Sequence, residues 1–253
     1  MFTKQTSAAS IKPAANEPPV VNLQSSPDRF YRAIITLRNL INYAYDMRAF
    51  RIVGGPDWAS SDRWEVSAKA DTAVTPSEMA RLVRRLLADR FALKTHLETR
   101  ELPIYNLVLG RGDRRLGPRM KPAAIDCEPF FRRERRTQDS PVDPATGVPR
   151  CATSFRISPG VTTARYNGTP TSRLATFLST EAGRWIEDRT ELSGSYDIEL
   201  TYQSDAMLLP GAAPKEAPAL FTALQEQLGL KLEPSRGPVE VLVIDSVERP
   251  TPD

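Results

Sequence analysis

Histidine and cysteine are scarce in this chain, which has one histidine and two cysteines among its 253 residues. A structural zinc site takes four ligands, most often cysteine or histidine, so the familiar zinc sites are excluded. His96 lies in the alternating run LKTHLETRE, and no serine or cysteine motif marks a nucleophile that it would activate. We interpret His96 as a solvent-facing strand residue and predict no catalytic residue.

Long apolar runs are also missing, because no stretch approaches the roughly 18 to 20 apolar residues of a membrane span. The opening residues, MFTKQTSAAS, lack the apolar core of a signal peptide. We expect a soluble chain with no membrane span. Either it is cytoplasmic, or an export signal lies outside this sequence.

Glycine is outnumbered by proline, 13 to 22, in a composition that is otherwise ordinary for a globular protein. The length exceeds the common domain size of about 100 to 150 residues, which favours two units. The net charge is only +3, but arginine is concentrated in residues 110–136. A basic patch there could bind nucleic acid or another anion; because prolines and acids interrupt it, we favour a solvated, flexible segment. The patch consists of Arg132, Arg133, Arg135 and Arg136.

Cys127 and Cys151 both lie in the proline-rich middle of the chain. Bonded to each other, they would close a loop of about 25 residues and stabilise the fold by about 3 kcal/mol. In a reducing cytosol they would be two free thiols. The residues alone leave both alternatives open.

Hydrophobic periodicity predicts four helices, each followed by two strands. The second helix has a capping box, with Thr75 before it, Pro76 at its first position and Glu78 three residues after the cap. Further strands are expected before the first and third helices, and the extended residues 9–23 could add an edge strand or stay mobile. The predicted helices cover 36–47, 75–90, 170–183 and 217–229; the strands after them cover 50–53, 63–70, 91–98, 104–110, 184–189, 195–203, 230–234 and 239–247.

The two halves of this pattern share one spacing. Leu37 and Ile41 correspond to Leu174 and Leu178 at an offset of 137 residues, and the same offset relates the second and fourth helices. We therefore predict an α+β fold of two internally duplicated αββαββ halves, with helices packed on one face of mainly antiparallel sheets. The expected segments are an extended start (1–27), a first half (28–110), a Pro/Arg-rich connection with both cysteines (111–160), and a second half (161–253).

One turn region is the main candidate binding surface. Gly54-Gly55-Pro56 joins two predicted strands, and a structural turn is the favoured interpretation. Pro56, Asp57 and Trp58 have no counterpart in the second half, which has only Gly194 there. This asymmetry makes Gly54 to Trp58, with Trp64 in the next strand, a candidate contact for a partner; core packing of the tryptophans is the alternative.

Acidic residues near the inner turns of both halves would permit a cation site. Carboxylates before strands more often cap turns, however, so we predict no metal and no cofactor. The residues considered are Asp57, Asp62, Asp188 and Asp197.

Four long blocks carry a resemblance to a known family: residues 36–70, 86–112, 188–202 and 220–250. With their Gly-Gly-Pro-x-Trp and Gly-Pro-Val-Glu-Val-Leu-Val-Ile-Asp motifs, they resemble the soil-associated proteins of unknown function found chiefly in acidobacterial genomes. Members are usually exported, and similar domains occur behind membrane metallopeptidases of the antibiotic-sensor type. The resemblance implies an extracytoplasmic location, periplasmic or secreted, and favours a Cys127–Cys151 disulfide.

The function expected from these observations is a non-enzymatic, extracytoplasmic binding module. Its expected partner is another protein or a cell-envelope component, bound at exposed sheet edges or at the Gly54 to Trp64 region. Two alternatives stay open: a hydrolase with an unrecognised site between the halves, and anion or nucleic-acid binding through the arginine-rich connection. Nucleic acid is the less favoured partner.

Overall fold

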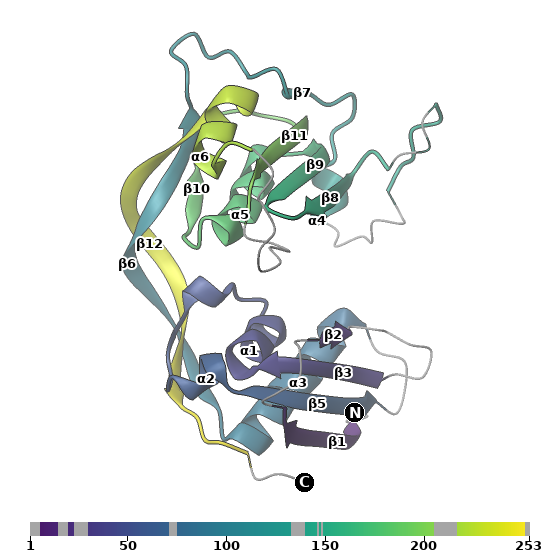
Figure 1. Cartoon of the computed structure of the whole chain (residues 1–253), viewed down its shortest axis with the longest axis vertical. Helices are drawn as coiled ribbons and strands as arrows, with labels where there is room; N and C mark the ends of the chain where they lie inside the picture. The colour runs from purple at the N-terminus through teal and green to yellow at the C-terminus, as the bar shows by residue number, and fades with distance from the viewer. Residues whose placement is uncertain are drawn as a thin grey trace. The chain divides into compact units, whose positions relative to one another are not determined.

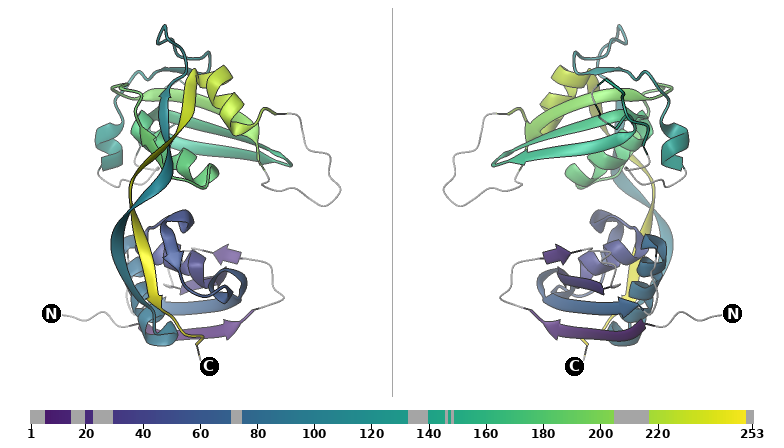
Figure 2. Two further views of the ribbon diagram at one scale, coloured as in Figure 1. Left: turned by 90° about the vertical axis from the view of Figure 1, so that its left-hand side faces the viewer. Right: turned by 90° about the vertical axis from the view of Figure 1, so that its right-hand side faces the viewer.

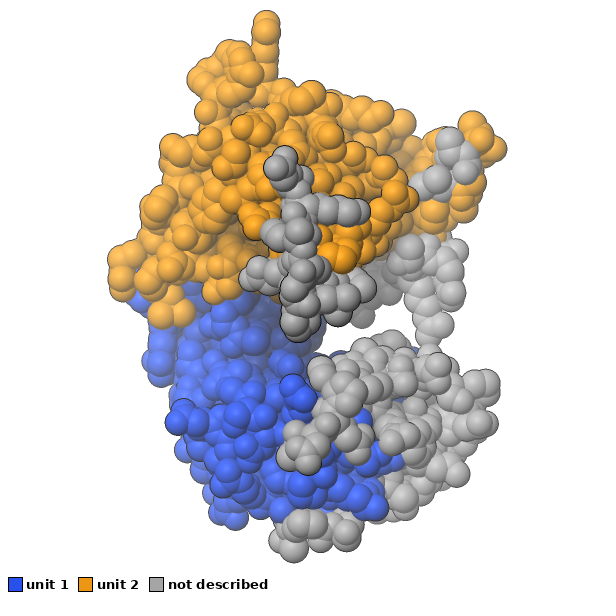
Figure 3. Space-filling model, in the orientation of Figure 1, with its two compact units in different colours: residues 1–101, 238–253 blue, residues 102–237 orange. Residues whose placement is uncertain are grey.

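The computed structural model is shown in Figure 1 and describes residues 6–14, 20–22, 30–70, 75–132, 140–145, 147, 149–204 and 217–250. The chain forms two compact units (Figure 3). Unit 1 contains residues 1–101 and 238–253, and unit 2 contains residues 102–237. The chain therefore crosses from one unit to the other twice.

Unit 1 combines a four-stranded antiparallel sheet, of order β1-β5-β3-β2, with helices α1 and α3. Helix α3 starts with the predicted capping box, in which the Thr75 hydroxyl accepts from the Glu78 backbone N–H and the Glu78 carboxylate accepts from the Thr75 N–H. The elements are β1 (Thr6–Pro13), β2 (Val20–Asn22), β3 (Phe30–Thr36), α1 (Leu37–Tyr45), η1 (Ala49–Arg51), β4 (Ile52–Gly54), α2 (Trp58–Ser61), β5 (Arg63–Ala70) and α3 (Pro76–Phe91).

The core of unit 1 follows from the spacing of apolar residues along its helices and strands. Leu37, Leu40, Ile41 and Ala44 share one face of α1 and are buried. They belong to one apolar cluster with alternate residues of β5, Trp64 and Val66, and with the buried face of α3.

Unit 2 has the same kind of construction, with a sheet of order β7-β11-β9-β8. Alternate residues of β9 and β11, among them Tyr166 and Ile198, form one core with Leu178 of α5 and Leu224 of η3. Burial raises the pKa of the Tyr166 hydroxyl, so the phenol stays neutral in the folded state. The elements are β7 (Met120–Pro122), α4 (Glu128–Arg132), β8 (Ala152–Ser158), β9 (Val161–Thr169), α5 (Thr171–Glu181), β10 (Ile186–Asp188), β11 (Tyr196–Gln203), α6 (Leu220–Ala223) and the π-helical turn η3 (Leu224–Leu228).

Two long strands, β6 (Lys94–Leu109) and β12 (Leu230–Ser246), form the centre of a third sheet of order β10-β6-β12-β4. They lie side by side (Figures 1 and 2) and run antiparallel, because Gly110 N donates to Gly229 O at one end and Glu248 N donates to Phe91 O at the other. In unit 1, β4 pairs in parallel with β12; in unit 2, β10 pairs in parallel with β6.

The structure confirms a mixed α+β fold with antiparallel sheets and few helices. It differs from the sequence pattern where two strands are predicted after the second and fourth helices, because β6 and β12 are each continuous. Pro103, Pro234 and Pro238 interrupt the pattern there. The register pairs with β4 and β10 involve only Leu242–Ile244 of β12 and Tyr105–Leu107 of β6, so none of these prolines lies in a stretch that pairs with a short strand. Proline in a strand is tolerated where its missing N–H has no partner to bond.

Regular structure is also present in the stretch 111–160, which the sequence predicts to be a Pro/Arg-rich connection between the two halves. Within its described residues lie β7, α4 and β8, and both strands join the sheet of unit 2. The extended start supplies edge strand β1, as the sequence suggests. None of the helices in the described ranges is long and apolar enough to span a membrane.

Candidate functional site

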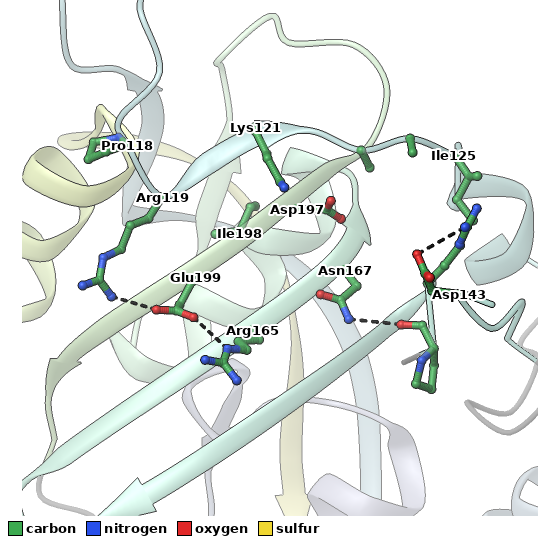
Figure 4. Close-up of a pocket in the computed structure, with 14 residues that line it drawn as sticks. Pro118, Arg119, Lys121, Ile125, Asp143, Arg165, Asn167, Asp197, Ile198 and Glu199 are labelled. Carbon is green, nitrogen blue, oxygen red and sulfur yellow. Dashed lines mark hydrogen bonds and ion pairs between the residues drawn. The ribbon is translucent and has the colours of Figure 1, made fainter. Parts of the chain in front are cut away.

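A pocket of about 570 Å³ lies in unit 2, on the face of the sheet that points away from the core (Figure 4). The pleat creates this face, because successive side chains of a strand point to opposite sides. Tyr196, Ile198 and Leu200 of β11 are buried, whereas Asp197 and Glu199 between them line the pocket. The remaining lining residues are Pro118, Arg119, Lys121, Ala123, Ala124, Ile125, Asp143, Pro149, Arg150, Arg165, Asn167 and Ile198.

Two segments of the connection form the walls of the pocket: residues 118–125 on one side, and Asp143, Pro149 and Arg150 on the other. Each wall runs into a cysteine, and a disulfide joins Cys127 to Cys151, with a Cα–Cα distance of 5.5 Å. Both cysteines are buried. The disulfide that the sequence leaves undecided is therefore formed, and it ties the two walls together.

Gly168 is the residue of β9 that packs against this disulfide. Its φ is +60°, and a Cβ atom on it would clash with Cys127 Sγ and lie 2.8 Å from the Arg150 carbonyl oxygen. Only glycine has neither the Cβ nor a penalty for this φ. The sheet and the walls therefore meet at a position that excludes a side chain.

A carboxylate held between two guanidinium groups lies on the pocket floor. Glu199 Oε1 accepts from Arg119 Nη1 at 2.9 Å, and Glu199 Oε2 accepts from Arg165 Nε at 2.7 Å. The three residues come from adjacent strands or their flanks, since Glu199 lies opposite Arg165 in the register and its N–H donates to the Arg119 carbonyl. All three side chains are between a third and slightly over a half exposed, so each ion pair adds at most about 1 kcal/mol to stability.

The other polar groups of the lining are engaged with the walls or the backbone. Arg150 pairs with Asp143 at 3.2 Å, and the Asn167 side-chain amide donates to the Pro149 carbonyl at 3.1 Å. Asp197 lies where the β9–β11 register shifts, and its Oδ1 accepts from the Gly168 N–H at 3.0 Å. The Lys121 side chain is exposed, and its ammonium has no ion pair or hydrogen bond within the described part of the chain.

These groups are suited to binding. The described lining offers guanidinium, ammonium, amide and carboxylate groups, and it holds no histidine, serine or free thiol that would act as a nucleophile–base pair. Charged hydrogen-bonding groups around a cavity of this size are what small polar ligands require.

The Gly54 to Trp64 region that the sequence singles out lies in unit 1. Gly54 and Gly55 have φ values of +78° and +80°, and a Cβ on either would lie within 3.1 Å of Ile244 atoms. Arg38 holds the turn, because its guanidinium donates to the carbonyl oxygens of Ile52 and Gly54. The positive φ values and the close approach of Ile244 explain why both positions are glycine.

The two tryptophans of this region pack differently. Trp64 is 5% exposed and contacts Phe91 edge to face, whereas Trp58 is half-buried, with its ring edge to face with Trp64 and beneath the Arg249 guanidinium. Pro56 and Asp57 precede the short helix that Trp58 begins. Partner binding at Trp58 stays a prediction.

Most of the predicted basic patch cannot be placed. Arg132 ends α4, but its side chain, together with Arg133, Arg135 and Arg136, lies outside the described residues. His96 is solvent-facing, with Nδ1 2.8 Å from Asp245 Oδ1. Where the chain is described, no group of three histidine, cysteine or acidic residues could hold a metal ion.

Sequence reasoning missed the pocket residues Arg165, Asn167 and Glu199. Arg119 and Lys121 lie in the arginine-rich stretch 110–136, but the sequence does not single them out within it. The alternation in 196–203 does predict that Glu199 points away from the core. No pattern in the sequence shows that β7 adds to this sheet, or that the two walls converge over it.

A comparison with protein families identifies the chain. The family model described as "Protein of unknown function (DUF3738)" matches residues 38–247. The chain belongs to this family. The DUF3738 match covers both units, including the pocket and both cysteines. No curated protein and no solved structure matches the chain.

Proposed function

We propose that this DUF3738 protein is a non-enzymatic, extracytoplasmic binding module whose ligand site is the pocket of unit 2. The observation that carries the proposal is the form of the site: charged side chains on an open sheet face, between two walls joined by a disulfide. Rigid walls keep a binding site preorganised, which lowers the entropic cost of binding.

Two observations support the location. Disulfides form and persist in oxidising compartments, such as the periplasm or the extracellular space, and Cys127 and Cys151 are bonded. The resemblance to soil-associated, usually exported proteins agrees with this. In relatives that follow membrane metallopeptidases of the antibiotic-sensor type, such a module would present its ligand site outside the membrane; the partner we propose is another protein or a cell-envelope component.

We further propose that the chain arose by internal duplication. The sheet orders β1-β5-β3-β2 and β7-β11-β9-β8 correspond strand by strand in chain order, which supports this origin. So do the left-handed residues after the helices: Asp46 and Gly183 are 137 positions apart, as are Ala92 and Gly229. Each long strand then belongs to one half and pairs with the short strand of the other.

The proposed function is tested by filling the pocket. Three proteins are exported to the periplasm of a bacterial host and purified: the wild type, an Asn167→Trp variant and a Thr176→Trp control. Native mass spectrometry then compares the small molecules bound to each. Thr176 is exposed on helix α5 of the same unit, and the pocket lining does not include it. We expect a co-purifying ligand, or one captured from an envelope extract, in the wild type and the control but not in Asn167→Trp.

Equal ligand content in all three proteins would contradict the pocket as the site. Turnover in a screen of esterase, phosphatase, peptidase and glycosidase substrates, abolished by Asn167→Trp, would contradict the non-enzymatic function.

A further inference from the structure

We infer that the pocket binds a small anionic ligand carrying a carboxylate or phosphate group; this rests on the proposed function and names its ligand class. The inference comes from counting which hydrogen-bonding groups of the lining are already used and which are left for a ligand.

The acceptors of the pocket are largely occupied. Both oxygens of Glu199 accept from arginine side chains. Asp143 Oδ2 accepts from Arg150, and its Oδ1 accepts from the Ala145 N–H. Asp197 Oδ1 accepts from Gly168 N–H. A cationic ligand would therefore have to displace an arginine from Glu199 or Asp143, or bind at the remaining oxygen of Asp197, beside the Lys121 ammonium.

Donors are in excess. A guanidinium group has five N–H donors and an ammonium group has three. Arg119 directs Nη1 to Glu199 and Thr201, and Arg165 directs Nε to Glu199. Most of their remaining N–H groups have no partner within the described residues. The same is true of all three N–H groups of the Lys121 ammonium. The lining carries four basic and three acidic side chains, so a positive charge is left over.

The unused donors lie along the same sheet face. Lys121 of β7 is directly opposite Asp197 of β11, and Glu199 of β11 is directly opposite Arg165 of β9. Figure 4 shows the Lys121 amine beside Asp197 and Ile198, with the Arg119 and Arg165 guanidinium groups farther along the strands. Opposed side chains in a sheet are about 5 Å apart at Cβ. An anionic group above β11 is thus within reach of Lys121 and an arginine together.

Size limits the ligand to a small molecule. Pockets of roughly 300 to 1,000 Å³ enclose ligands of metabolite or drug size, and this one has about 570 Å³. Of the charged lining groups, Lys121 is the one without a partner in the described residues. It therefore contributes a charge to the ligand without first breaking an internal pair.

The test measures binding of four probes by calorimetry at fixed ionic strength: citrate, inorganic phosphate, neutral trehalose and cationic spermidine. Lys121→Gln removes the unpaired charge. Lys94→Gln is the matched control, since Lys94 is an exposed lysine of β6 outside the pocket and causes the same change in net charge. We expect citrate or phosphate to bind the wild type, with affinity at least tenfold weaker in Lys121→Gln and within twofold of wild type in Lys94→Gln.

The outcomes separate this inference from the proposed function. If neither acid binds, or if Lys94→Gln weakens binding as much as Lys121→Gln, the anionic ligand class is wrong. If trehalose or spermidine binds instead and Asn167→Trp abolishes that binding, the pocket stands as a ligand site and only the ligand class falls. If citrate or phosphate binds but Asn167→Trp leaves its affinity unchanged, the pocket itself is not the site.

Discussion

Gly168 connects the disulfide with the sheet that carries the pocket floor. The position has two requirements: its φ is +60°, and it has no room for a Cβ, because Cys127 Sγ and the Arg150 carbonyl oxygen occupy that space. Cys127 continues one wall and Arg150 lies in the other. A side chain at this position must therefore push a wall away from the sheet.

An alanine in the left-handed conformation costs about 1 kcal/mol by itself. We expect Gly168→Ala to lower the free energy of unfolding by more than this amount. Gly183→Ala is the control, since Gly183 has the same φ of +60° and nothing within 4 Å of its Cβ position. Urea unfolding of both variants isolates the steric contribution. Equal losses in the two variants would show that the contact with the disulfide adds nothing.

Single residues also show where sequence reasoning succeeds and where it stops. The Thr75–Glu78 capping box is readable because all its interactions are local. The Cys127–Cys151 pairing is undecided by the sequence, since it depends on the compartment and on a Cα–Cα distance that only the fold sets. The pocket residues were missed for the same reason: Arg119 meets Glu199 across 80 positions of sequence.

At the scale of elements, the disulfide fixes two irregular segments that regular hydrogen bonding holds only in part. One wall contacts the sheet through β7, which has three residues and pairs with β11. The other wall contains a bridge between Val142 and Pro149, and the Pro149 carbonyl accepts from the Asn167 side chain of β9. The disulfide spans 24 residues and restricts this stretch in the unfolded chain as well as in the folded one.

Replacing both cysteines, Cys127→Ser and Cys151→Ser together, should lower the free energy of unfolding by about 3 kcal/mol. Wild-type protein in reductant should unfold at the same urea concentration as the double variant, because it lacks the same crosslink. The variant should also bind citrate or phosphate more weakly, since its walls are no longer tied. A loss below about 1 kcal/mol would mean that other contacts already hold the walls.

Helices were the most predictable elements, and strands within the connection the least. Helices α1 and α3 follow from a 3.6-residue pattern with clear caps. Strand β8 does not: Phe155 and Ile157 are exposed at the edge of the sheet, so its apolar residues do not mark a buried face. The continuity of β6 and β12 through prolines was likewise missed, because it depends on which strand edges have neighbours.

At the scale of the whole molecule, unit 1 is completed by a distant part of the sequence. Unit 1 contains residues 238–253, although everything else in it precedes residue 102. Leu242 and Ile244 of this segment are buried in the core of unit 1, and β4 has its register pairs with them and Val243. Folding of unit 1 therefore depends on the last residues of the chain.

Truncation after Gly237 should selectively destabilise unit 1. Removing residues 238–253 takes Leu242 and Ile244 from the core of unit 1 and leaves all of unit 2, so the loss is comparable to that of two large core side chains, about 4 kcal/mol or more. Hydrogen exchange measured by mass spectrometry should accelerate in α1, β5 and α3 while β9, α5 and β11 keep their protection. A synthetic peptide of residues 238–250, added in trans, should restore protection in unit 1, because it replaces the missing strand. Equal loss of protection in both units would instead mean that the chain unfolds as one cooperative body, in which the long strands couple the two cores.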